Sequence, residues 1–341
     1  MRWVCRTLVV AGFAVAGAAL AARPPAWQWH LPAGIRPPPV SADNPISAAK
    51  VALGRRLFYD ADLSIDGTIS CATCHEQHRA FADGNRTHGG VGVARGRRNV
   101  MALANVAYFT PLTWADPRQR RLDKQALVPL TGSHPVEMGM AGQDAELARR
   151  LAADSCYRRM FAAAFPNGRI DTERVTMAIA SFEQTLLSFD SPYDRFRRGD
   201  RDTISDQAKS GAKIFEKTCA SCHAGPNFTD GRYHNIGLYN ADNVSVMDHG
   251  LREVTGSPQD EGAFRTPSLR NIALTGPYMH DGSVRNLTIA IRRHALPSGV
   301  GHALSDSELS RILAFLQSLS DSTFVTNPNF SLPKSACGKP L

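Results

Sequence analysis

Apolar residues recur every three or four positions along most of this chain, whereas sustained alternation of apolar and polar residues is scarce. The first pattern is typical of amphipathic helices and the second of strands, so the sequence predicts a mainly α protein. The longest helical face has five apolar positions: Val175, Ile179, Phe182, Leu186 and Leu187. Ser205 is a good N-cap for a second helix, and the capping box Ser305-Asp306-Ser307-Glu308 opens a third.

The N-terminus has the pattern of an export signal. Arg2 and Arg6 precede an apolar run that ends in small residues at Ala21 and Ala22. The apolar core is only about a dozen residues long, and a bilayer core is about 30 Å thick. We therefore expect residues 1–22 to be a cleaved signal peptide rather than a retained membrane anchor, which leaves a periplasmic protein with no membrane span.

Two copies of the motif CxxCH are the strongest chemical signal. They are Cys71-Ala72-Thr73-Cys74-His75 and Cys219-Ala220-Ser221-Cys222-His223. In this motif the two thiols form thioethers to the haem vinyl groups, and the adjacent histidine binds the iron. A zinc site or a redox dithiol is the alternative for CxxC alone, but a histidine follows in both copies. The sequence thus predicts two covalently bound c-type haems.

The two motifs divide the chain into halves of similar plan. Each follows a predicted helix with one glycine and one phenylalanine, which are Gly54 and Phe58 in the first and Gly211 and Phe215 in the second. We therefore expect two cytochrome c-like haem domains packed against each other. The expected segments are a proline-rich lead-in at 23–46, an N-terminal haem domain at 47–198, a C-terminal haem domain at 199–325 and a tail at 326–341.

The net charge and the cysteines outside the CxxCH motifs give little further information about function. The net charge is +8, but the basic residues are scattered, which argues against nucleic acid and suits an encounter with an acidic partner protein. Of the seven cysteines, Cys5 lies in the predicted signal peptide and four lie in the motifs. Cys156 and Cys337 remain, and in an oxidising compartment they either pair or stay as two thiols.

Several strings carry a resemblance to a known family. They are residues 68–75, 125–138, 264–271 and 277–282. In them the chain resembles the bacterial di-haem cytochrome c peroxidase and MauG family, from about Leu53 to Leu319. Residues 102–108, 112–114 and 125–130 most resemble the MbnH branch of that family.

The resemblance implies that the N-terminal haem reacts with hydrogen peroxide. Glu137 would be the acid/base that moves a proton between the peroxide oxygens, and Gln125 would line the same pocket. Without the resemblance, a lone glutamate in a segment rich in proline and glycine reads as solvated. Trp114 would lie between the two haems and couple them electronically, the alternative being a plain core indole.

The resemblance also implies one calcium ion between the domains. Asn99, Thr275 and Pro277 match its ligand positions, where an amide oxygen and two backbone carbonyls suit this hard cation.

The sixth ligand of the second haem departs from the family pattern. It is a methionine in standard peroxidases and a tyrosine in MauG, but His294 stands at that position, fourteen residues after His280. His294 shares a helical face with Leu287 and Ile291, and His302 is a lesser rival. Imidazole in place of thioether should lower the reduction potential of this haem.

At the first haem, the resemblance offers a histidine in the loop after the motif as a labile blocking ligand. His78 and His88 lie there without the expected flanking pattern. We therefore expect an open pocket and keep His88 as the candidate blocking ligand.

Three functions are compatible with these residues. The first is oxidation of a partner, which for the MbnH branch is a small exported copper-binding protein whose tryptophan becomes kynurenine. The second is peroxide scavenging with electrons from a soluble cytochrome or cupredoxin. The third is pure electron transfer, which Glu137 and the open first haem disfavour. His294 favours the first function over the second.

Overall fold

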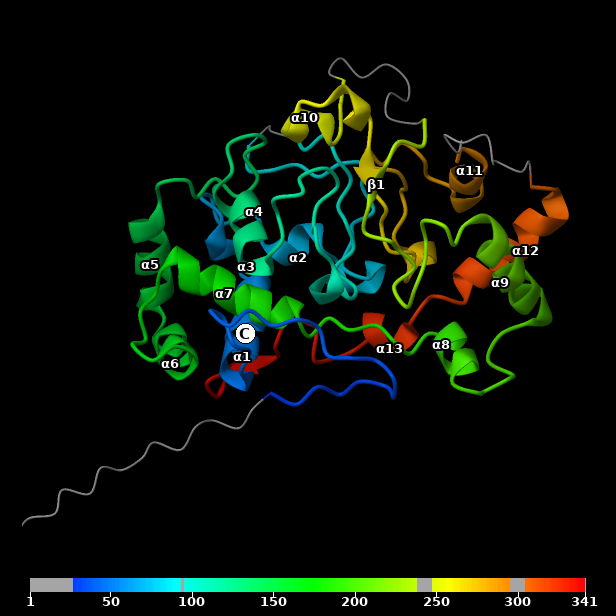
Figure 1. Ribbon diagram of the computed structural model, residues 1–341. Coiled ribbons are helices and arrows are strands. Elements are labelled where there is room, and N and C mark those ends of the chain that lie inside the picture. Colours follow the sequence, from blue (N-terminus) through cyan, green and yellow to red (C-terminus); the bar gives the residue numbers. More distant parts are fainter. Residues whose placement is uncertain (1–26, 93–94, 238–246, 295–303, 341) are drawn as a thin grey trace, which may run out of the picture.

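The computed structural model describes residues 27–92, 95–237, 247–294 and 304–340. The expected signal peptide and His302 lie outside these residues. Within them the protein is mainly helical, as predicted, and it has two cytochrome c-like halves that lie side by side (Figure 1). No helix of the described residues is both long and apolar enough to cross a membrane.

The α-helices of the described residues are as follows: α1 Ala48–Phe58, α2 Cys71–Cys74, α3 Leu122–Gln125, α4 Leu127–Thr131, α5 Asp144–Ala153, α6 Ser155–Ala164, α7 Thr172–Glu183, α8 Pro192–Arg197, α9 Asp206–Thr218, α10 Arg252–Thr255, α11 Leu287–Arg292, α12 Asp306–Gln317 and α13 Ser322–Val325. The strands form two antiparallel pairs, β1 Tyr233–His234 with β2 Phe264–Arg265 and β3 Ser335–Ala336 with β4 Lys339–Pro340.

The N-terminal half is built on the crossing of α1 with α7. A Cβ on Gly54 would lie 1.8 Å from the backbone oxygen of Ala178, so only glycine lets the two helices approach this closely. The apolar faces around the crossing are fully buried at Leu53, Leu57 and Phe58. This core lies beside α2, which carries the first CxxCH motif.

The C-terminal half repeats the arrangement with α9 and α12. Ser205 caps α9, and the capping box of Ser305 and Glu308 opens α12, both as predicted. A Cβ on Gly211 would lie 1.9 Å from the backbone oxygen of Arg311, so a glycine again permits the crossing. Phe215, at the next turn of α9, packs against Phe315 of α12 with ring centres 4.9 Å apart.

The C-terminal segment returns to the N-terminal half. In Figure 1 the chain runs from α12 through α13 to its end beside α1. Phe324 and Phe330 belong to the same buried cluster as Phe58 and Phe81. Cys156 in α6 and Cys337 are joined in a disulfide, which answers the question that the sequence left open. The predicted tail is therefore part of the N-terminal core.

The two halves are held together by polar contacts. Arg98 makes two hydrogen bonds of 2.8 Å to the carboxylate of Asp248, and Arg86 pairs with Asp281 at 3.1 Å. These four residues come from opposite halves, so the ion pairs span the junction on which the functional site lies.

Candidate functional site: two haem-binding motifs

The first four residues of the first motif form α2, and His75 follows as its C-cap. The ring of His75 is held by a hydrogen bond of 2.7 Å from Nδ1 to the carbonyl oxygen of Phe81. Phe81 has a positive φ of 63°, which turns this carbonyl towards the ring. Burial lowers the pKa of His75, so the imidazole is neutral. With Nδ1 as donor, Nε2 keeps the lone pair that an iron ion needs.

The second motif repeats this geometry at the end of α9. His223 donates from Nδ1 to the carbonyl oxygen of Phe228 at 3.1 Å, and Phe228 also has a positive φ, of 51°. Burial lowers the pKa of His223 to about 4. Both motif histidines are therefore fixed as neutral ligands with a free Nε2.

His294 faces His223 across the second site. It follows α11, and its Nδ1 donates to the carbonyl oxygen of Ala290 at 2.8 Å. The two ring centres are 6.4 Å apart. Two imidazoles on opposite faces of one iron would be separated by about 6 Å, because each metal–nitrogen bond is about 2 Å long and each ring centre lies about 1 Å beyond its nitrogen. The residues present thus fit a haem ligated by two histidines.

A cavity of about 270 Å³ lies between these histidines and extends to the junction of the halves. Its walls include Cys219, Cys222, His223 and His294. The thiols and imidazoles needed to attach a haem therefore line one space, which supports the predicted attachment at this motif.

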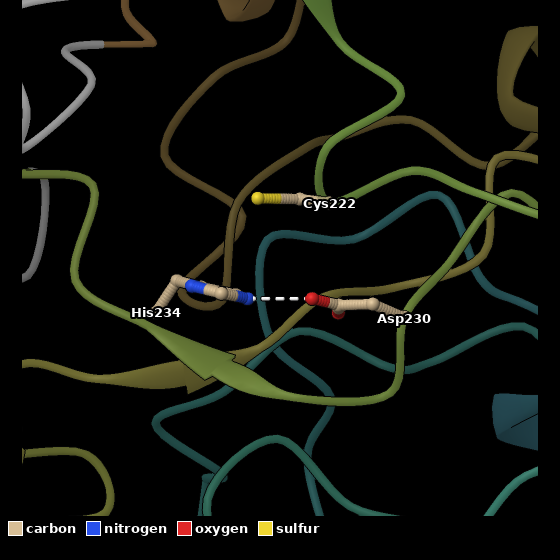
Figure 2. A group of neighbouring side chains, drawn as sticks. All are labelled: Cys222, Asp230 and His234. Carbon is tan, nitrogen blue, oxygen red and sulfur yellow. Dashed lines mark hydrogen bonds and ion pairs between the residues drawn. The ribbon is translucent and has the colours of Figure 1, made fainter.

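A second group of donors adjoins the motif. The sulfur of Cys222, a carboxylate oxygen of Asp230 and a ring nitrogen of His234 lie within 4.8 Å of one another (Figure 2). Such a group could hold a soft metal ion. However, Cys222 is needed for the haem thioether, and both Cys222 and His234 line the cavity of the haem site. Asp230 accepts a hydrogen bond of 2.8 Å from Nε2 of His234 and fixes that ring.

Glu137 lies beside the first motif. Its negative charge adds to burial in raising the pKa of the Cys74 thiol to about 12, and it acts on Cys71 in the same direction. Burial raises the pKa of Glu137 itself, against the opposing charge of His88. A Cβ on Gly90 would lie 1.9 Å from the carbonyl oxygen of Val136, so the loop of His88 packs directly on the segment of Glu137.

A buried carboxylate fixes the orientation of the His88 ring. Its Nδ1 lies 2.8 Å from Oδ2 of Asp83, which is 1% exposed. Burial would raise the pKa of Asp83, but hydrogen bonds from His88 and Asn85 outweigh it and lower that pKa. His78, the other histidine of this loop, is 72% exposed and points to solvent.

Gln125 ends α3 and is half-buried. Within the described residues, its side chain makes no hydrogen bond with Glu137. Its expected place in the same pocket stays a prediction.

Trp114 lies at the junction of the halves. Its indole Nε1 donates to the carbonyl oxygen of Asn99 at 2.8 Å, and its own carbonyl oxygen accepts from the backbone N–H of Arg265 at 2.7 Å. Trp114, Asn99, Thr275 and Pro277 all line the cavity of the second motif. The structure thus brings together the predicted tryptophan and the three residues of the predicted calcium site.

Two buried charged residues were missed by the sequence reasoning. Glu183 in α7 has a pKa raised to about 8 by burial, and its Oε2 has no hydrogen-bond partner among the described residues. Its charge acts on Cys71, so it lies near the first motif. Arg265, on β2, is 3% exposed and lines the cavity of the second motif. No local signal identifies Glu183, and Arg265 lies in the string 264–271 that carries the family resemblance, which did not point to a role for it.

Comparison with known proteins agrees with this geometry. The family model for di-haem cytochrome c peroxidase matches residues 48–202, and the cytochrome c model matches residues 208–320. The methylamine utilization protein MauG of Methylophilus methylotrophus is 35% identical over 92% of this chain and 94% of its own. The chain belongs to the di-haem cytochrome c peroxidase and MauG family. It is therefore an oxidoreductase, a di-haem peroxidase with two c-type haems.

Other members of the family are similar to a comparable degree. The cytochrome c551 peroxidase of Pseudomonas aeruginosa is 36% identical to this di-haem peroxidase, over 81% of this chain and 80% of its own. A crystal structure of a MauG-like protein associated with microbial copper homeostasis matches with a TM-score of 0.84 and 39% identity, over 91% of this chain and all of that one. Relatives named as peroxidases and relatives named MauG thus match about equally well in sequence.

Proposed function

We propose that this di-haem peroxidase reduces hydrogen peroxide at its N-terminal haem and draws the electrons through its second haem from a partner protein, which it thereby oxidises. The proposal rests on one difference between the two haem-binding sites. The second site has histidines on both sides, His223 and His294, with ring centres 6.4 Å apart. The first site has His75 on one side and the half-buried carboxyl group of Glu137 nearby. The second site would thus hold its haem between two histidines, and the first site offers a group that could transfer a proton.

The haem at His75 supplies an iron ion that binds peroxide and takes up oxidising equivalents. The chain supplies the proton transfer. Glu137, as carboxylate, accepts the proton of the peroxide oxygen nearer the iron and returns it to the far oxygen, which leaves as water. Because partial burial raises the pKa of Glu137, it holds this proton at a higher pH than an exposed glutamate would.

His294 and Trp114 govern where the oxidising equivalents go. Two imidazoles give a lower reduction potential than imidazole with thioether, so the second haem is easier to oxidise. Trp114 lines the cavity of that haem, and its indole N–H is fixed to the backbone of Asn99. We infer that Trp114 would pass oxidising equivalents between the two haems and on to the partner.

The partner we propose is a small exported copper-binding protein with an oxidisable tryptophan, as in the MbnH branch. The similar MauG-like protein associated with copper homeostasis supports this choice. The alternative is scavenging of peroxide with electrons from a soluble cytochrome or cupredoxin, which the similarity to the Pseudomonas aeruginosa peroxidase favours. His294 favours the first, because a haem of low potential is a poor acceptor for electrons from such donors.

Location and calcium belong to the same proposal. The Arg2 to Ala22 pattern supports export to the periplasm, where haems of this type are attached. Asn99, Thr275 and Pro277 line one cavity at the junction of the halves and would supply oxygen ligands to one calcium ion.

A peroxide titration of the fully oxidised protein, without any reductant, tests the function. Optical and electron paramagnetic resonance spectra should show one high-spin and one bis-histidine haem, which react at once and together hold two oxidising equivalents. If nothing reacts until one haem is reduced, the protein is a scavenging peroxidase and partner oxidation is wrong.

A further inference from the structure

Among the described residues of the C-terminal half, two arginine side chains are buried, and only one of them has a carboxylate partner. Arg270 is 3% exposed and makes two hydrogen bonds, of 2.8 and 2.9 Å, to the carboxylate of Asp194. Arg265 is also 3% exposed, but it forms no ion pair with any described residue. The fold therefore satisfies one buried charge completely and leaves the other without a counter-charge.

The contacts that Arg265 does make are weak. Its guanidinium reaches the carbonyl oxygens of Leu112, Thr113 and Thr266 only at 3.3 to 3.4 Å, and the sulfur of Met101 at 3.6 Å. These distances exceed the usual range for N–H to O bonds. Burial lowers the pKa of Arg265 to about 10, so the side chain still carries its charge at neutral pH. A buried charge without a partner is strongly unfavourable, so an anion is expected here.

The position of Arg265 indicates which anion this is. Arg265 lines the cavity that also holds Cys219, Cys222 and His223, so a haem attached there would share its space. Its contacts at Leu112 and Met101 belong to the other half of the protein, which places the guanidinium at the junction of the halves. A haem carries two propionate carboxylates, and a planar guanidinium binds a carboxylate through two parallel hydrogen bonds.

A second donor without a partner among the described residues lies close to Arg265. Tyr233 of β1 is paired in register with Arg265 of β2, and its hydroxyl is buried without a hydrogen-bond partner among the described residues. The charge of Arg265 acts on this hydroxyl, so the two groups are close. A carboxylate at this point would provide an acceptor for both.

We propose that Arg265 binds a propionate carboxylate of the haem attached at Cys219, Cys222 and His223, and so anchors that haem to the junction of the two halves beside Trp114. The backbone N–H of Arg265 donates to the carbonyl oxygen of Trp114 at 2.7 Å, which connects Arg265 directly to Trp114. Arg265 is thus a positioning residue. The inference requires the second haem but not the proposed partner oxidation.

The test uses the haem-loaded protein and the variants Arg265→Gln and Arg265→Lys. Loss of the buried positive charge favours the ferric state, so Arg265→Gln should lower the reduction potential of the second haem in a spectroelectrochemical titration. It should also shift the propionate bending band in the resonance Raman spectrum. Arg265→Lys keeps the charge but not the two parallel bonds, so it should keep most of the potential and still shift the Raman band. If the glutamine variant does not fold, the Raman band of Arg265→Lys still tests the proposal.

Arg120→Gln is the matched control. Arg120 is exposed, makes no ion pair with any described residue and acts on the same Tyr233 hydroxyl. Its removal takes away one charge near the site without touching a propionate, so neither the potential nor the band should change. Equal small shifts in Arg120→Gln and Arg265→Gln, with an unmoved band, would overturn the proposal.

Titration with acetate tests whether the anion bound by Arg265 is a haem propionate or a free carboxylate. If a covalently held propionate occupies the site, the potential of the unaltered protein should not depend on acetate concentration at constant ionic strength. A potential that changes with acetate would identify a free carboxylate as the occupant, and the proposal would be wrong. Each result is independent of whether peroxide oxidises a partner protein.

Discussion

Glu137 lies beside the first motif with a carboxyl group that is half-buried and free of side-chain hydrogen bonds among the described residues. If it transfers the proton of peroxide, Glu137→Gln should slow the reaction of the oxidised protein with peroxide by about 10²- to 10⁴-fold, the usual contribution of a general acid/base. Stopped-flow spectra of the haem would measure this rate. Glu216→Gln, on the exposed face of α9, is the control and should react like the unaltered protein.

The haem spectra of Glu137→Gln before peroxide is added should match those of the unaltered protein. A fast reaction in this variant would show that another group moves the proton. Glu183, which is buried near Cys71, would then be the next residue to replace.

The pH dependence of the same rate gives a second test of Glu137. Burial raises its pKa, and the charge of His88 opposes this only in part. The proton-accepting carboxylate therefore predominates only above that raised pKa. The rate should rise with pH through a value higher than that of an exposed glutamate and then level off. This rise should be absent in Glu137→Gln, and a rate that stays flat with pH in the unaltered protein would contradict the assignment.

His294 is the residue that we expect to be the sixth ligand of the second haem. Replacing it with methionine should raise the reduction potential of that haem, because a thioether favours the ferrous state more than an imidazole does. A spectroelectrochemical titration would measure the change, with the first haem as an internal reference. If the low-spin spectrum and the potential both stay unchanged, His294 is not the ligand, despite its ring lying 6.4 Å from that of His223.

At the scale of the elements, each half depends on one glycine where two helices cross. Gly54→Ala would place a Cβ 1.8 Å from the backbone oxygen of Ala178, so α1 and α7 must separate. Overpacking of this kind costs about 1–3 kcal/mol or more in the free energy of unfolding, which urea denaturation would measure. Gly96→Ala is the control, since its Cβ would meet only ordinary contacts, at 3.6 Å or beyond. An equal effect of both variants would show that the crossing tolerates a methyl group.

The helices around the motifs could be predicted because their signals are local. Caps such as Ser205 and the box of Ser305 and Glu308 depend on residues within one turn, and all were found as expected. The αL turns at Phe81 and Phe228, which hold the motif histidines, could not be predicted from residue type. Phenylalanine rarely adopts a positive φ, so here the surrounding packing imposes the conformation.

Contacts between distant segments could not be predicted from the sequence, because they depend on how those segments pack in the folded protein. The unpaired charge of Arg265 exists only because β2 packs against the segment of Leu112 and Thr113 from the other half. The lack of a partner for Glu183 likewise depends on everything that surrounds α7. His294 was identified through a resemblance, and its orientation towards His223 rests on the packing of α11 beside α12.

At the scale of the whole molecule, the C-terminal segment packs against α1 of the N-terminal half. It leaves the C-terminal half after α12, and hydrogen bonds from Arg55 in α1 reach the carbonyl oxygens of Pro328 and Ser331. The segment also reaches the first haem site. The ring of Phe324 packs on that of Phe81 with centres 5.7 Å apart, and the carbonyl of Phe81 orients His75.

The disulfide between Cys156 and Cys337 should stabilise this closure. It joins residues 181 positions apart, and long loops lose the most chain entropy when they are cross-linked. Replacing both cysteines with serine should lower the free energy of unfolding by about 2–5 kcal/mol, measured by urea denaturation of the haem-loaded protein. Ser335→Ala, in the neighbouring β3, is the control and should change little.

The rate of the reaction with peroxide shows whether the disulfide only restrains the unfolded chain or also positions Phe324 in the folded protein. If the disulfide only restrains the unfolded chain, the double serine variant should react with peroxide at the normal rate, because Phe324 still packs on Phe81 in the folded state. A slower reaction, with an altered spectrum of the first haem, would mean that the cross-link also holds Phe324 in place. The C-terminus would then help to orient His75 through Phe81, although it lies at the opposite end of the sequence from the first motif.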